Sequence, residues 1–159
     1  MLLLICITVL PIQTTLEELF FRSYLMKGIG LLAKSKWIPL IITSLLFGLV
    51  HSSNPEISKY GVVPMQLYYI SAGLLLGIMT IMDDGLELAI GVHAATNIYG
   101  ALFFCYDGSV LQTDSIWHVT DINAWVMAGV FIVSGIIFLI LSKKMFDWGS
   151  WSKLTEKID

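Results

Sequence analysis

The chain has 159 residues, of which 57% are hydrophobic and only 13% are charged, against roughly 25% charged residues in an average soluble domain. One soluble core of this length cannot bury so much apolar surface, whereas a bilayer accommodates helices of about 20 apolar residues. The net charge is −3 and there is no basic run, which argues against a nucleic-acid partner. The composition therefore predicts a multi-pass integral membrane protein in contact with the lipid bilayer.

Hydrophobic runs predict an all-α, polytopic membrane helical bundle of about five helical segments. Short polar stretches with turn-forming residues separate the runs, and no repeat or linker divides the chain, so we expect a single domain over residues 1–159. The apolar runs are 1–12, which the charged stretch 14–27 continues, 37–50, 62–82, 86–104 and 124–142.

The first segment contains Pro11, which removes a backbone donor and kinks or restarts a helix. One interpretation is a single kinked helix over residues 2–27. The other is a helix that restarts near Ile12, with Glu17 and Glu18 in its first turns, where the helix dipole favours acidic groups. We favour the restart.

Two sets of lysines predict the orientation. One set flanks the first connection and the other lies in the C-terminal tail, and the alternation of five segments places both sets on the same side. Cytoplasmic loops are enriched in lysine and arginine, so we expect the C-terminal tail to be cytoplasmic. The lysines are Lys27, Lys34 and Lys36, and Lys143, Lys144, Lys153 and Lys157.

Several polar side chains lie within apolar segments, where a central charge costs about 2.5 to 3.5 kcal/mol. Glu18 and Arg22 are four residues apart with the acid first, the favourable order for an ion pair. His93 and Asn97 are also four apart and share one helix face. Taken singly, each of these polar residues has a structural explanation. Glu18 and Arg22 could neutralise each other's charge, and Asn97 could form a hydrogen bond between helices. Together they favour one polar cavity between three helices. The residues expected to line this cavity are Glu17, His51, His93 and Asn97.

The expected depth of Glu17 in the membrane supports the restarted helix. At a rise of about 1.5 Å per residue, a start near Ile12 places Glu17 about 8 Å from the end of its helix, where it can meet the other three residues. A single helix from Leu2 would place Glu17 at about 22 Å, where the match is worse.

The segments that carry these residues resemble the CAAX prenyl endopeptidase family, which includes many bacterial CPBP or Abi-type membrane proteins. The stretch "EELFFR" is similar to the EExxxR motif, "FGLVH" to FxxxH and "HAATN" to HxxxN, in the family's order and within residues 12–104. The resemblance implies an all-helical intramembrane peptidase in which a glutamate activates water. It also implies a role for each residue: Glu17 as the general base, His51 as a holder of the water, His93 and Asn97 as the oxyanion site, and Glu18 with Arg22 as supporting residues.

The chain departs from the family at its N-terminus. Family members usually carry several spanning helices before the first motif, whereas about a dozen residues precede it in this sequence. We therefore expect either an N-terminally truncated chain or a reduced member of the family.

Two alternatives to this peptidase remain open. Glu17, His51 and His93 could form a zinc site with an open position for water, although no HExxH pair is present and Asn97 stands where its second histidine would. The other alternative is a non-catalytic membrane scaffold or immunity protein of the same fold. We favour a peptidase without a cofactor, acting on a membrane-associated peptide or protein substrate.

Overall fold

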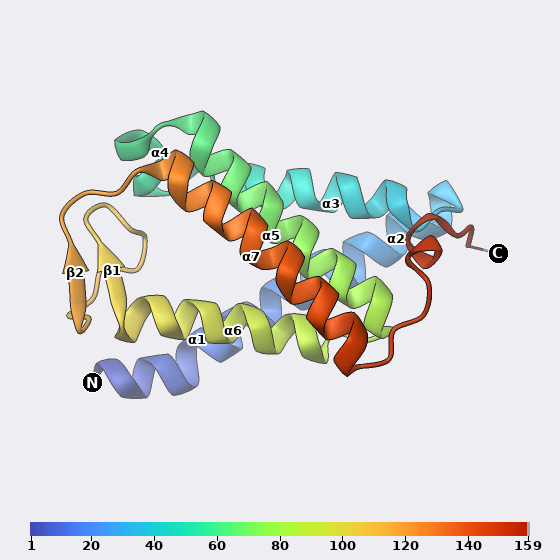
Figure 1. The fold of residues 1–159 in the computed structure, drawn as a ribbon, viewed down its shortest axis with the longest axis horizontal. Coiled ribbons are helices and arrows are strands. Elements are labelled where there is room, and N and C mark those ends of the chain that lie inside the picture. The colour runs from blue at the N-terminus through green and yellow to red at the C-terminus, as the bar shows by residue number, and fades with distance from the viewer. Residues whose placement is uncertain (159) are drawn as a thin grey trace.

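Long helices run roughly along one axis in the computed structural model, which describes residues 1–158 (Figure 1). The N-terminus and two short strands lie at one end of this bundle, and the C-terminus lies at the other. The helices are α1 (Leu2–Glu18), α2 (Met26–Ala33), α3 (Trp37–Val50), α4 (Pro55–Tyr60), α5 (Val62–Asp83), α6 (Glu87–Leu102) and α7 (Ala124–Met145), and the strands are β1 (Phe104–Tyr106) and β2 (Trp117–Val119).

The all-α membrane bundle expected from the sequence is confirmed. Within residues 1–158, three helical stretches are long and apolar enough to cross a membrane, namely residues 2–33, α5 and α7. The run predicted at 37–50 is α3, and the later runs match α5, α6 and α7 to within three residues at each end. Hydrophobic runs alone therefore located four of the long helices.

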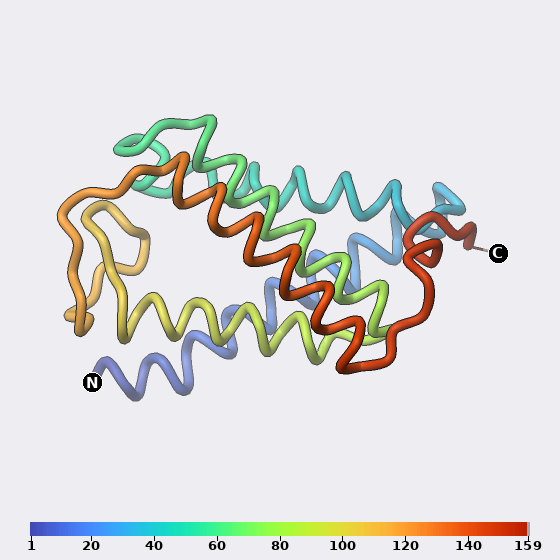
Figure 2. Tube along the Cα trace, in the orientation of Figure 1, coloured from blue at the N-terminus to red at the C-terminus, as the bar shows by residue number. Residues whose placement is uncertain are grey.

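The predicted restart at Pro11 is wrong. α1 passes through Pro11 and continues through a π-helical turn, Leu19–Leu25, into α2, and Figure 2 shows the trace of this stretch without a break. Proline is tolerated inside membrane helices because nearby hydroxyl groups and local adjustments satisfy the freed backbone groups. The carbonyl that loses its donor is that of Ile7. One turn later, the Thr15 hydroxyl donates to the Pro11 carbonyl at 2.6 Å.

α3 and α5 pack closely because small residues line their contact. A Cβ atom added to Gly73 of α5 would lie 2.9 Å from the Ser44 Cα of α3 and 3.2 Å from the Phe47 Cβ. Small residues let membrane helices approach in this way. The close approach aligns Phe47, and His51 one turn later, against α5.

Replacing Gly73 with alanine is expected to lower the free energy of unfolding by about 1 to 3 kcal/mol, the usual cost of overpacking a tight contact. The measurement is a denaturant titration in detergent micelles, followed by circular dichroism. Gly129→Ala in α7 is the matched control, since nothing lies within 4 Å of its Cβ position and alanine is favoured in a helix. Equal stability of the two variants would contradict the tight α3–α5 contact.

The structure brings the two lysine sets to one end of the bundle. Lys36, before α3, pairs with Glu156 of the tail at 2.7 Å, and Lys153 pairs with Asp84, after α5, at 2.6 Å. The tail therefore packs against the connection before α3 and the connection after α5, which lie at this end as the alternation of segments predicts.

Candidate active site

A cavity of about 540 Å³ lies between α1, α3, α5 and α6, and the loop after β1 covers part of it. All four residues expected to converge, Glu17, His51, His93 and Asn97, line this cavity. They come from three helical segments that are far apart in the sequence.

Glu17 reaches the cavity from an uninterrupted helix, so the prediction that only a restart near Ile12 would bring it to the other three residues is wrong. The helices do not all begin at the same level. α1 packs along α6 and continues beyond it through the π turn into α2 (Figure 1). Distance from the first residue of α1 consequently does not measure depth in the bundle.

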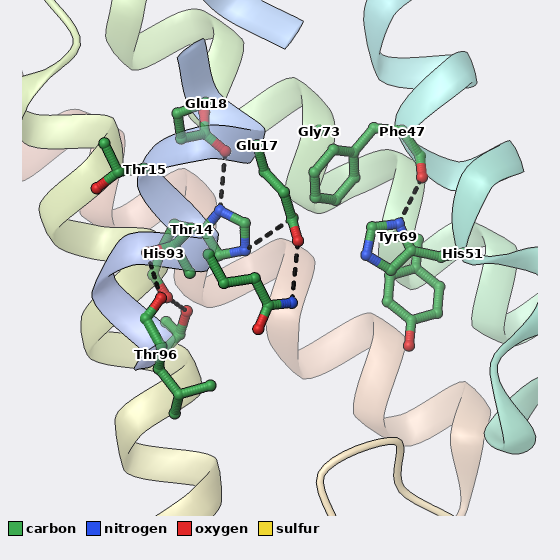
Figure 3. A network of polar contacts seen from close by, with 12 residues as sticks. Thr14, Thr15, Glu17, Glu18, Phe47, His51, Tyr69, Gly73, His93 and Thr96 are labelled. Carbon is green, nitrogen blue, oxygen red and sulfur yellow. Dashed lines mark hydrogen bonds and ion pairs between the residues drawn. The ribbon is translucent and has the colours of Figure 1, made fainter. Parts of the chain in front are cut away.

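His93 lies between the two glutamates of the first motif (Figure 3). Its Nδ1 atom is 2.8 Å from Glu18 Oε1, and its Nε2 atom is 3.8 Å from Glu17 Oε2. An ionised carboxylate can only accept, so Nδ1 carries a proton. Nε2 then donates a hydrogen bond only when the ring carries two protons. Gln13 donates to the other Glu17 oxygen at 3.1 Å.

Glu18 and Arg22 form the expected ion pair. Arg22 Nε lies 3.2 Å from Glu18 Oε2, and both side chains are fully buried. Arg22 also donates from Nη2 to the Gly73 carbonyl at 3.1 Å, and its guanidinium lies 4.8 Å from the centre of the Phe47 ring. The pair thus connects the first helical stretch to α3 and α5.

Arg22 lies within the π-helical turn, which was not expected from the sequence. π-Helical turns are rare and occur frequently at functional sites. Hydrophobicity does not distinguish them from ordinary helix, so no signal in the sequence could have located this one.

His51 follows α3 and is held by its own helix. Its Nδ1 atom lies 2.7 Å from the Phe47 carbonyl. A carbonyl only accepts, so Nδ1 donates and the neutral ring keeps a lone pair on Nε2. The Phe47 and His51 rings pack with their centres 4.5 Å apart, and Phe47 also contacts His93 at 5.9 Å. The FxxxH spacing therefore places Phe47 against both histidines.

The residues lining the cavity that were not predicted from the sequence include Asn54, Glu56 and Tyr69. The Tyr69 hydroxyl donates to Glu56 Oε1 and accepts from Asn54 Nδ2 at 2.8 Å. Glu56 is only 2% exposed, although it lies in a polar stretch that has the composition of a solvated loop. Only the packing of α4 against α5 reveals its burial.

The loop that carries β1 and β2 covers the cavity at the end away from the tail. The strands pair in parallel, with Cys105 opposite His118. A hydrogen bond from His118 to Asp107, 2.6 Å long, holds the pKa of the Asp107 carboxyl below its usual range. Burial, reinforced by the Glu56 charge, raises the pKa of the Tyr106 phenol. Tyr106 therefore stays protonated in the cavity wall.

The donors of the alternative zinc site are not arranged as a metal site. Within residues 1–158, no three His, Cys, Asp or Glu side chains are placed to hold a metal ion. The Nδ1 atoms of the two cavity histidines are engaged, one with Phe47 and one with Glu18, so these rings could bind a metal only through Nε2.

Comparison with known proteins agrees with the motifs. No solved structure matches the chain. The uncharacterized protein YyaK of Bacillus subtilis (strain 168) is 33% identical over 138 residues, covering 86% of this chain and 46% of the relative, so the chain spans about half the length of that relative. Residues 1–99, which contain all three motifs, match the family described as type II CAAX prenyl endopeptidase Rce1-like. The chain belongs to this Rce1-like family of membrane proteases.

Proposed function

We propose that the protein is an intramembrane endopeptidase in which Glu17 activates water to hydrolyse a peptide bond of a membrane-associated peptide or protein. The observation that carries this proposal is the meeting of Glu17, His51, His93 and Asn97 on one cavity. The Glu17 side chain is 27% exposed, so water and substrate can reach its carboxylate.

A cavity residue can carry out each proton transfer of the hydrolysis. Glu17 accepts a proton from water, and the lone pair on His51 Nε2 accepts a second hydrogen bond that orients it. The water oxygen bonds to the carbonyl carbon, and the electron pair of the carbonyl bond moves to its oxygen. The electron pair on the oxyanion then re-forms the carbonyl as the carbon–nitrogen bond breaks, and Glu17 gives its proton to the leaving amine.

The oxyanion formed in this reaction needs donors. The Asn97 amide donates without any change of protonation, whereas His93 donates from Nε2 only as an imidazolium. Removing one such donor typically costs about 100- to 1,000-fold in rate.

The lysines at the tail end support a cytoplasmic C-terminus, and the covered end of the cavity then faces the opposite side of the membrane. A reporter enzyme fused after the tail and active only in the cytoplasm tests this orientation. Activity of the reporter supports it, and activity only of a periplasmic reporter contradicts it.

The proposed activity is tested with purified protein in lipid vesicles and a library of membrane-embedded peptides, with and without a prenylated cysteine. Mass spectrometry of the products identifies any bond that is cut. Cleavage at defined bonds supports the peptidase. Specific retention of uncut peptides would favour the non-catalytic scaffold instead.

Chelator treatment in the same vesicles is expected to leave the cleavage rate unchanged within about twofold, because the cavity residues act as base and donors without a metal. The measurement compares initial rates before and after dialysis against a strong chelator. Loss of activity that added zinc restores would contradict the metal-free mechanism and favour the site formed by Glu17, His51 and His93.

A further inference from the structure

A buried carboxylate in the cavity wall has no part in the mechanism above. Glu56 lies in α4, and one of its oxygens, Oε2, has no hydrogen-bond partner within residues 1–158. A buried polar atom without a partner costs about 1 to 3 kcal/mol, and such an atom in a native protein calls for an explanation. The other oxygen, Oε1, accepts the hydroxyl proton of Tyr69.

The Tyr69 hydroxyl is fixed from both sides. It donates to Glu56 and accepts from Asn54, which uses its single donor and one acceptor site. The ring is 7% exposed and belongs to the apolar cluster that also contains Phe21 and Phe47. Tyr69 therefore has one packed orientation.

The face of Tyr69 lies against His51 (Figure 3). The two ring centres are 4.4 Å apart and the planes are 24° from parallel. The Phe47 carbonyl binds Nδ1, and the stacked phenol restricts rotation of the imidazole. Together these contacts determine where the Nε2 lone pair lies in the cavity.

We propose that Tyr69 and Glu56 are positioning residues for His51. Glu56 and Asn54 hold the phenol, and the phenol holds the imidazole so that Nε2 faces the water which Glu17 activates. This inference rests on the proposed function for the step that it serves. Misplacement of a reacting group by about 1 Å can cost about 100-fold in rate.

The first readout is the His51 ring itself and does not depend on cleavage. The chain has three histidines, so selective ¹⁵N labelling gives few signals, which His93→Gln and His118→Gln assign. Protonated and unprotonated imidazole nitrogens resonate far apart. Wild type is expected to give one His51 tautomer with the proton on Nδ1.

The second readout is kcat on a peptide that wild type cleaves. Tyr69→Leu removes stacking and hydroxyl, and it is expected to average the His51 signals and lower kcat about 100-fold. Tyr69→Phe keeps the stacking and is expected to lose about tenfold, the value of one hydrogen bond. Glu56→Leu should resemble Tyr69→Phe, whereas Glu56→Gln still offers an oxygen to the phenol and should stay within about threefold of wild type.

Met79→Ala is the control for general destabilisation, because Met79 is fully buried in a different cluster. It is expected to lower stability and leave the His51 signals unchanged. Unchanged His51 signals in Tyr69→Leu, or equal changes in Met79→Ala, would overturn the proposal. Failure of wild type to cleave any peptide would contradict the proposed function and leave the tautomer measurement to decide the positioning role.

Discussion

Replacing Arg22 with methionine is expected to lower the free energy of unfolding by about 3 to 5 kcal/mol, the usual cost of removing one partner of a buried ion pair. The variant leaves Glu18 as a buried charge and also removes the donor to the Gly73 carbonyl. The measurement is a denaturant titration in detergent micelles. Lys144→Met, which removes an exposed positive charge, is the matched control.

A second variant separates charge pairing from lost packing. Glu18→Gln combined with Arg22→Met leaves no unpaired charge, and the glutamine oxygen can still accept from His93. This double variant is expected to be more stable than Arg22→Met alone. A double variant less stable than Arg22→Met would show that the buried pair is not the reason for the loss.

Replacing Glu17 with glutamine is expected to slow peptide cleavage by about 100- to 10,000-fold, the usual contribution of a general base. Glutamine has the shape of glutamate but does not take a proton from water. KM should change little, because the carboxylate acts on water rather than on the substrate. Single-turnover kinetics in vesicles measure the chemical step, and Glu87→Gln in the exposed first turn of α6 is expected to retain the wild-type rate.

The helices α3, α5, α6 and α7 could be predicted because each is a continuous apolar run between polar turns. The cavity residues could be predicted because a polar side chain inside such a run is costly and its spacing assigns it to a face. His93 with Asn97 and Glu18 with Arg22 illustrate this. The apolar run and the spacing of polar residues within it can both be read from a short stretch of sequence.

The features that were missed depend on contacts between distant segments. The rule that proline ends a helix is weaker in a bilayer, so Pro11 predicted a break that is not there. Glu56 has the surroundings of a solvated loop and is buried only because α4 folds against Tyr69 of α5. The pairing of β1 with β2 likewise joins two parts of one loop. Each strand has residues that favour strands, but with three residues it is too short to stand out in the sequence.

The assignment of Glu17 rather than Glu18 as the base is tested most directly by measuring kcat and the free energy of unfolding for Glu17→Gln and Glu18→Gln side by side. At equal amounts of folded protein, we expect Glu17→Gln to keep wild-type stability and to lose cleavage. We expect Glu18→Gln to lose stability, because Arg22 is left buried without its partner, and to retain measurable cleavage. Cleavage by Glu17→Gln at the wild-type rate would contradict the proposed mechanism.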